Sequence, residues 1–401
     1  MRRGEEIKHW VEDSIDRGYS KQEIIDLLRG SNYTADEIED ILKVRTNLQT
    51  IPKIKAEFLR KSKETKLKKE DVGGIDLDKV PSDSEIKEVS ELIKLVKIEL
   101  AKTVIGQEEI IEAFICALLC DGHVLLEGVP GIAKTLIVKT LAKASGCSVK
   151  RIQFTVDLLP SDIVGLTTYT PQKGFETIKG PIFANFIVAD EINRSPPKTQ
   201  SALIEAMQEK QVTIAKETFK LPIPFFVMAN NNPLETSGVY DLPEAQIDRF
   251  LFKLIIGYPK NSSEEKQIMD TNTTLRKFED YDIKAVLSPE KIIHMQKLTK
   301  EIYIDEKIKD YIVKIIEKTR KKDFKNGEFI DWGGSPRASI AMFIASKAWA
   351  LMKGRNYVIP KDVKDTIHFC LRHRIMLNYK ARAEKIDSDK IIDEILDLVD
   401  L

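Results

Sequence analysis

The chain has 401 residues, of which 42% are hydrophobic and 31% are charged, values typical of a folded globular protein with more than one domain. Lys and Arg together number 63, as do Asp and Glu, so the formal net charge is zero at pH 7. This balance gives no overall electrostatic attraction to nucleic acid or to an acidic membrane surface.

Neither a secretory signal nor a membrane span is recognisable in the sequence. The first residues, MRRGEEIKHWVEDS, contain no apolar core of signal-peptide length, and no window approaches the roughly 20 apolar residues of a membrane helix. The 4 cysteines are too few for a disulfide framework in so long a chain. We therefore expect a cytoplasmic protein that does not contact a membrane.

Residues 1–48 contain an internal repeat and are expected to form a small module of three helices. The segments GYSKQEIIDLL and NYTADEIEDIL align with each other, and each opens with a capping box of Ser or Thr followed three residues later by Glu. Two roles remain open for this module: it docks a partner, or it is a cap that keeps the protein soluble or stabilises an oligomer. Residues 49–84 are rich in lysine and are expected to be a charged, mobile linker.

Residues 85–260 have the pattern of an α/β domain with a parallel sheet. A long amphipathic helix comes first, with an apolar stripe of Ile86, Val89, Ile93, Val96 and Leu100. Short apolar segments then alternate with helical patterns, and these segments are HVLLEG, KRIQF, NFIVADE, PFFVMAN and FLFKLII. Such alternation predicts parallel strands joined by crossover helices.

Residues 261–401 are expected to form a separate helical domain, with no strand beyond Tyr258. Its clearest helices are SPEKIIHMQKLTKEI, DEKIKDYIVKIIEKTRK, SPRASIAMFIASKAWALMKG and PKDVKDTIHFC. All of them carry apolar residues at helical spacing.

The segment GVPGIAKT, which begins at Gly128, matches the pattern G-x-x-x-x-G-K-[ST] of a phosphate-binding loop except that Ala133 replaces the last glycine. It lies between a strand and a helix, where backbone N–H groups hold phosphates. In this setting Lys134 neutralises charge on the β- and γ-phosphates and Thr135 binds Mg²⁺. The expected nucleotide-binding residues are Gly128, Val129, Pro130, Gly131, Ile132, Ala133, Lys134, Thr135 and Leu136.

Two carboxylates leave the apolar strand NFIVADE, as in a Walker B motif. Asp190 is placed to hold Mg²⁺ through its water shell, and Glu191 to orient and polarise the water that attacks the γ-phosphate. An ordinary strand end with two solvated acids is the simpler alternative. The position downstream of a phosphate-binding loop favours the catalytic interpretation.

Polar residues at three further positions complete the candidate site. The strand PFFVMAN runs into residues 230–232, which are all asparagine and are placed to hold the same water or the γ-phosphate. Arg249 follows a short helix and either pairs with Asp248 or reaches the γ-phosphate of a neighbouring subunit as an arginine finger. Arg337 lies at the start of a helix behind Pro336, where it can follow a nucleotide as a lid closes.

These motifs together, over about residues 85–382, closely resemble the MoxR family of AAA+ ATPases. The resemblance depends on GVPGIAKT, DLLPSDIVG, GPIFANFIVADEINRSPPKTQSALIEAMQEKQVTI, NNNP, LPEAQIDRF and GSPRA, and the family typically has alanine before the P-loop lysine. The resemblance implies Walker A at Lys134 and Thr135, Walker B at Asp190 and Glu191, sensor 1 at Asn232, the arginine finger at Arg249 and sensor 2 at Arg337. One departure is that Asn231 replaces the family's usual Gln, which leaves Asn231 or Asn232 as the working sensor.

The resemblance also implies a fold and an activity. The fold would be a five-stranded parallel AAA+ core followed by an α-helical lid domain, with β-hairpins at residues 165–180 and near residues 209–222. Subunits would assemble into a ring, usually a hexamer, and hydrolyse ATP with Mg²⁺ at sites between them. The implied role is chaperone-like remodelling or maturation of protein clients, often with a von Willebrand A domain partner.

Two other functions remain open from the sequence. Related AAA+ branches with similar hairpins include DNA motors, and basic or aromatic residues in both candidate hairpins are compatible with nucleic-acid binding. The second open function is a nucleotide-controlled assembly switch that hydrolyses little nucleotide. The visible motifs do not read the base, so they do not distinguish ATP from GTP.

Overall fold

A computed structural model describes residues 80–128, 134–172, 174–231, 238–259, 261–272 and 278–401. The predicted N-terminal module and nearly all of the predicted linker lie outside these residues. So do residues 129–133 of the phosphate-binding loop, Ala133 among them, and Asn232. The chain divides into one unit of residues 1–78 and another of residues 79–401, and only the second is described below.

A parallel sheet of 5 strands lies at the centre of the second unit, in the order β2-β5-β8-β1-β9. The strands are β1 (Val124–Gly128), β2 (Val149–Gln153), β5 (Phe186–Asp190), β8 (Phe226–Asn231) and β9 (Phe252–Ile256). Every neighbouring pair is parallel. The predicted fold class and all of the predicted core strands are therefore confirmed.

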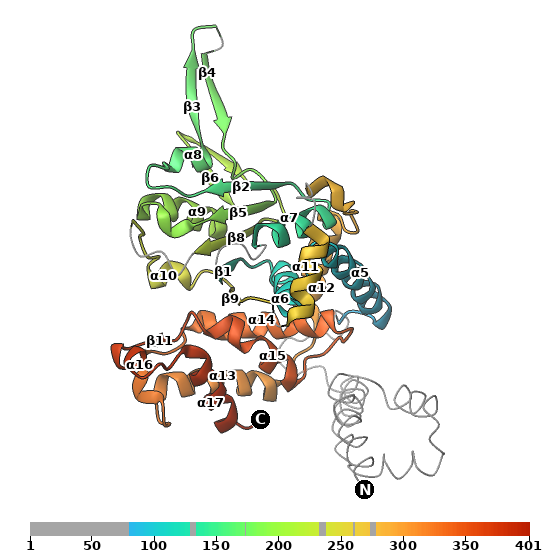
Figure 1. Ribbon diagram of the computed structural model, residues 1–401, viewed down its shortest axis with the longest axis vertical. Helices are drawn as coiled ribbons and strands as arrows, with labels where there is room; N and C mark the ends of the chain where they lie inside the picture. Colours follow the sequence, from blue (N-terminus) through green and yellow to red (C-terminus); the bar gives the residue numbers. More distant parts are fainter. Residues whose placement is uncertain (1–79, 129–133, 173, 232–237, 260, 273–277) are drawn as a thin grey trace, which may run out of the picture. The chain divides into compact units, whose positions relative to one another are not determined.

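Both faces of the sheet are covered by helices because side chains alternate along each strand. On one face, Val124 and Leu126 join the apolar cluster of α5 (Asp83–Ala101), α6 (Glu108–Leu119) and α7 (Lys134–Ala144). On the other face, Leu125 packs in a cluster with α8 (Pro160–Val164) and α9 (Pro197–Glu209). Figure 1 shows these helices around the sheet. The predicted apolar stripe of the first long helix is fully buried in α5.

Two antiparallel hairpins leave this α/β layer, as the family resemblance predicts. One consists of β3 (Gly165–Thr170) and β4 (Gly174–Lys179), and the other of β6 (Gln211–Ile214) and β7 (Glu217–Lys220). The β3–β4 hairpin projects from the sheet (Figure 1). At its base Gly165 has φ of +108°, and a Cβ there would lie 2.2 Å from the carbonyl oxygen of Ile178, so only glycine fits.

The remaining residues are mostly helical. They form α10 (Glu244–Ile247), α11 (Ser262–Asn272), α12 (Pro289–Glu301), α13 (Glu306–Lys321), α14 (Pro336–Met352), α15 (Pro360–Leu371), α16 (Tyr379–Ala383) and α17 (Ser388–Leu398). Short 3₁₀ turns occur at Ile192–Arg194, Phe278–Tyr281 and Gly327–Phe329. None of the described helices combines the length and apolar character needed to cross a membrane.

The prediction that no strand follows Tyr258 is wrong. β10 (Ile330–Trp332) pairs in antiparallel fashion with β11 (Met376–Leu377). The two segments are only 3 and 2 residues long and are separated by helices α14 and α15. Strands this short carry no readable alternation, and their pairing depends on how the helices between them fold.

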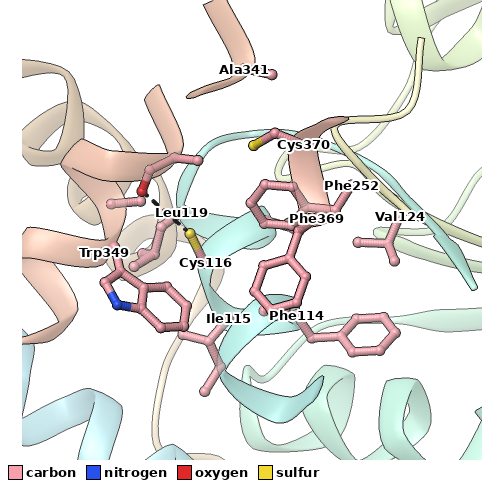
Figure 2. Packing of buried hydrophobic residues seen from close by; sticks show 14 of the residues in the cluster. Phe114, Ile115, Cys116, Leu119, Val124, Phe252, Ala341, Trp349, Phe369 and Cys370 are labelled. Atoms are coloured by element: carbon pink, nitrogen blue, oxygen red, sulfur yellow. Dashed lines mark hydrogen bonds between the residues drawn. The ribbon is translucent and has the colours of Figure 1, made fainter. Parts of the chain in front are cut away.

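The C-terminal helices pack against the core through α5, α6 and β9. Figure 2 shows Cys116 of α6 beside Trp349 of α14, with Phe369 and Cys370 of α15 near Phe252 of β9. The thiol of Cys116 donates a hydrogen bond to the carbonyl oxygen of Ala345 at 3.7 Å. One continuous apolar cluster therefore joins the sheet to these helices.

Candidate functional site

The candidate phosphate-binding residues lie at one edge of the sheet. Gly128, Asp190 and Asn231 are the last residues of β1, β5 and β8, which are neighbours in the sheet. Lys134 begins α7, the helix that follows β1. Since all strands are parallel, their carboxyl ends meet at this edge, which is where α/β proteins bind ligands.

Lys134 lies beside three carboxylates. Its Nζ donates a hydrogen bond to the carbonyl oxygen of Gly128. Burial lowers the pKa of Lys134, while the negative charges of Asp190, Glu191 and Glu127 oppose that shift. The lysine therefore supplies a desolvated positive charge at the edge, where a phosphate anion can bind it.

Asp190 is buried and already has two partners. Arg151 of β2 contacts one carboxylate oxygen at 2.5 Å through Nε, and the side-chain amide of Asn230 donates to the other. Arg151 and Asn230 therefore fix the position of the Asp190 carboxylate. A cation at this carboxylate would compete with Arg151.

Glu191 is fixed by its backbone as well as its side chain. Its φ of 56° lies in the left-handed region, which is uncommon for a residue other than glycine and often marks a functional site. Its backbone N–H donates to Asn230 Oδ1 at 2.8 Å. Its carboxylate accepts a hydrogen bond of 2.8 Å from Gln153 and lies 3.4 Å from Arg194 Nε.

The asparagine run divides into separate roles. Asn230 bridges Asp190 and the backbone of Glu191, so it supports the two acids. Asn231 donates to Glu127 at 3.1 Å, and its buried Oδ1 has no hydrogen-bond partner within the described structure. An acceptor available at a candidate site can receive a hydrogen bond from a bound water. Asn232, the sensor implied by the resemblance, is outside the described residues.

The residues present fit a magnesium nucleotide. Mg²⁺ prefers oxygen ligands and in nucleotide enzymes takes one or two protein groups, with phosphates and water completing its shell. The hydroxyl of Thr135 at the start of α7 and the carboxylate of Asp190 are oxygen donors of that kind. Among the described residues no group of three or more acidic, His or Cys side chains lies close enough together to hold a metal ion by itself.

Arg249 and Arg337 lie at the opposite edge of the sheet. The backbone N–H of Leu251 donates to the carbonyl oxygen of His123 at 2.9 Å, so the residues before β9 are next to the start of β1. β1 has 5 residues, which separates the two edges by roughly 15 Å. Arg337 contacts Asp248, the residue before Arg249, so both arginines lie at the edge away from Lys134.

Asp248 forms ion pairs with two arginines of the C-terminal region, and among the described residues the neighbouring Arg249 is not one of its partners. Its carboxylate contacts Arg337 Nη1 at 3.3 Å and Arg374 Nε at 2.8 Å. Arg249 is half-buried, and its Nε has no hydrogen-bond partner in the described structure. Ser335 precedes α14, but its hydroxyl donates to Asp248 and does not cap the helix.

Sequence reasoning missed several residues of the site. Arg151 and Gln153 come from β2, where they alternate with the buried Ile152. Glu127 is linked to Asn231 and lies 2.9 Å from Lys253 of β9. The polar residues of β2 were a signal that this strand borders a polar site, but their partners depend on the strand order.

Known proteins resemble this chain over most of its length. Residues 123–252 match the ATPase family associated with various cellular activities (AAA), and residues 325–395 match the AAA lid domain. Chaperone MoxR1 of Mycobacterium tuberculosis is 44% identical over 310 residues, which are 76% of this chain and 80% of that protein. The uncharacterised protein YeaC of Bacillus subtilis is 45% identical over 299 residues, or 74% of this chain and 91% of that protein.

A solved structure is similar over the same region. The crystal structure of a candidate ATPase from Cytophaga hutchinsonii has a TM-score of 0.74 and 41% identity, covering 82% of this chain and 99% of that one. Sequence identity and fold thus agree along the sheet and the helices that follow it. The chain belongs to the MoxR family of AAA+ ATPases.

Proposed function

We propose that this protein hydrolyses ATP with Mg²⁺ at sites shared between subunits of a ring, usually a hexamer, and uses the energy to remodel or mature protein complexes. One observation carries the proposal. Lys134, Asp190 and Glu191 meet at the carboxyl edge of the sheet, whereas the arginines proposed to act on the γ-phosphate lie at the other edge.

The residues of the carboxyl edge have distinct roles in this proposal. The N–H groups at the start of α7 and Lys134 bind the phosphates. Bound Mg²⁺ would neutralise phosphate charge, with Thr135 and Asp190 as the residues that hold it. Glu191 orients the attacking water and accepts its proton, and the free Oδ1 of Asn231 accepts a hydrogen bond from that water.

The opposite edge supplies Arg249 in trans. Because the two edges are roughly 15 Å apart, we expect Arg249 to reach the γ-phosphate bound to a neighbouring subunit and not the one bound to its own. Arg337 lies on the same side in this structure. It would serve either the neighbour's nucleotide or, after movement of the lid, the nucleotide of its own subunit.

A protein client is the proposed target, and a von Willebrand A domain protein is a candidate partner. The name of Chaperone MoxR1 supports a chaperone-like role. Steady-state ATP hydrolysis, measured with and without candidate protein partners, single-stranded DNA and duplex DNA, tests the proposal. Stimulation by protein is expected, and strong stimulation by DNA alone would overturn the choice of client.

A DNA-dependent motor is the second candidate, favoured by one observation. Tyr169 and Phe175 of the β3–β4 hairpin are 63% and 80% exposed, and their ring centroids are 5.1 Å apart. Exposed aromatic rings can stack on unpaired bases. Replacing both rings with Ala would abolish DNA stimulation if they serve that function.

A further inference from the structure

Arg374 of the lid donates several hydrogen bonds to the residues around Arg249. We call residues 248–251 the finger segment. Arg374 donates to the carbonyl oxygens of Asp248, Phe250 and Leu251 at 3.0, 2.6 and 3.0 Å, and to the carboxylate of Asp248 at 2.8 Å. Its side chain is only 3% exposed.

The neighbours of Arg374 attach to the same stretch of chain. His373 Nε2 forms a hydrogen bond of 3.1 Å with the carbonyl oxygen of Phe250. Arg372 donates to the carbonyl oxygen of Lys253 at 3.2 Å and pairs with Asp389 of α17 at 2.9 Å. Three consecutive residues after α15 thus fasten the lid to the backbone on both sides of Arg249.

Asp248 adds a second link from the lid. Besides Arg374, its carboxylate accepts a hydrogen bond from Ser335 at 3.2 Å and lies 3.3 Å from Arg337. Ser335 immediately precedes α14, and Arg337 lies in its first turn. The Nε of Arg249, in contrast, has no hydrogen-bond partner among the described residues, so we expect the backbone of the finger segment to set the position of this side chain.

We propose that Arg374 is a positioning residue, which through Asp248 and the backbone of the finger segment presents Arg249 to the nucleotide of the adjacent subunit. This inference rests on the proposed function, in which Arg249 acts in trans. It adds that a change in the lid of one subunit shifts the finger offered to the next subunit. Charge-assisted bonds such as these are stronger than neutral ones, so the attachment is stiff.

Asp248→Asn tests the inference while keeping the side chain's shape. The neutral amide accepts fewer hydrogen bonds, which loosens Arg374 and Arg337. We expect kcat to fall about tenfold or more, since small misplacement of a catalytic group has large effects, while KM for ATP stays within about twofold. Arg374→Lys, which keeps the charge but not the fork of donors, should give the same pattern. An unchanged kcat in folded rings of both variants overturns the inference.

Asp362→Asn is the matched control. Asp362 is buried and forms a paired contact with Arg355, at 2.5 and 2.8 Å, and among the described residues none of its hydrogen bonds reaches the finger segment. It should lower Tm with little change in kcat. A loss of kcat as large as that of Asp248→Asn would show that any weakening of the lid has this effect, and would overturn a specific role for Arg374.

Mixed rings separate this inference from the proposed function. A Lys134→Ala subunit keeps an intact finger, so co-expression with Asp248→Asn should restore activity above that of either variant alone. Co-expression of Lys134→Ala with Arg249→Ala should do the same. Rescue of Arg249→Ala without rescue of Asp248→Asn overturns the inference alone. Failure of both mixtures overturns the shared site and, with it, the inference.

Discussion

At the scale of single residues, contacts within the chain hold several side chains of the candidate site in place. Glu191 has a hydrogen bond to Gln153, a contact with Arg194 and a backbone bond to Asn230. These contacts hold the Glu191 carboxylate near Lys134. The proposed transfer of a proton from water depends on the negative charge of this one side chain. Turnover and binding should therefore respond differently to its removal.

Glu191→Gln should keep ATP binding and lose turnover. The amide fills the same space but cannot accept a proton from water, so kcat should fall on the order of 10²-fold to 10⁴-fold. Binding of a fluorescent ATP analogue and steady-state phosphate release check both parts. Glu205→Gln, an exposed position of α9, is the matched control. Normal turnover in Glu191→Gln would sink the Walker B assignment.

Alanine substitutions at Asn230 and at Asn231 should have different effects. Asn230→Ala removes partners from buried Asp190 and from the backbone of Glu191, so it should lower the free energy of unfolding by about 1–3 kcal/mol. Asn231→Ala should lower kcat with a smaller change in unfolding. Denaturant titration and ATPase assays compare the two. If Asn231→Ala hydrolyses ATP normally, Asn232 remains as the candidate sensor.

At the scale of elements, α5 attaches to the domain through the stripe read from the sequence. Ile93 is 1% exposed and Ile98 is 58% exposed on the same helix. Ile93→Ala should therefore lower the free energy of unfolding by about 2–5 kcal/mol, and Ile98→Ala should change it little. Urea denaturation of both variants measures the difference, and equal effects would contradict the burial of this helix.

Prediction from the sequence succeeded where the signal is local. The strands of the sheet and the stripe of α5 follow from apolar periodicity, and the hairpins from the family resemblance. Contacts between distant segments were beyond reach. Arg151 meets Asp190 because β2 pairs with β5, and Arg374 meets Asp248 because the lid docks beside β9. The division into four parts and the roles of the site residues stay predictions.

At the scale of the whole molecule, buried histidines link stability to pH. Burial lowers the pKa of His123 from 6.5 to about 4, and it lowers the pKa of His373 well below 6.5. Below pH 6.5 these histidines bind protons in the unfolded chain but not in the folded one. They therefore cost the folded state no free energy above pH 6.5, and the free energy of unfolding falls as the pH drops toward 4. His123 alone accounts for about 3 kcal/mol of this loss.

His123→Gln should weaken that dependence. The variant has no imidazole to protonate at this site, so the loss of unfolding free energy between pH 7 and pH 4.5 should be smaller than in the original protein. Denaturant titrations at the two pH values measure it. An equal loss in the variant and in the original protein would exclude His123 as the source.

The separation of lysine and arginine to opposite edges of the sheet has a further consequence for assembly. Each subunit would offer its nucleotide site to one neighbour and its arginine to the other, so contacts between subunits would run head to tail. Such a chain of contacts leaves one site without its arginine until the last subunit joins the first. Specific activity should therefore rise steeply with protein concentration and level off once the circle is closed.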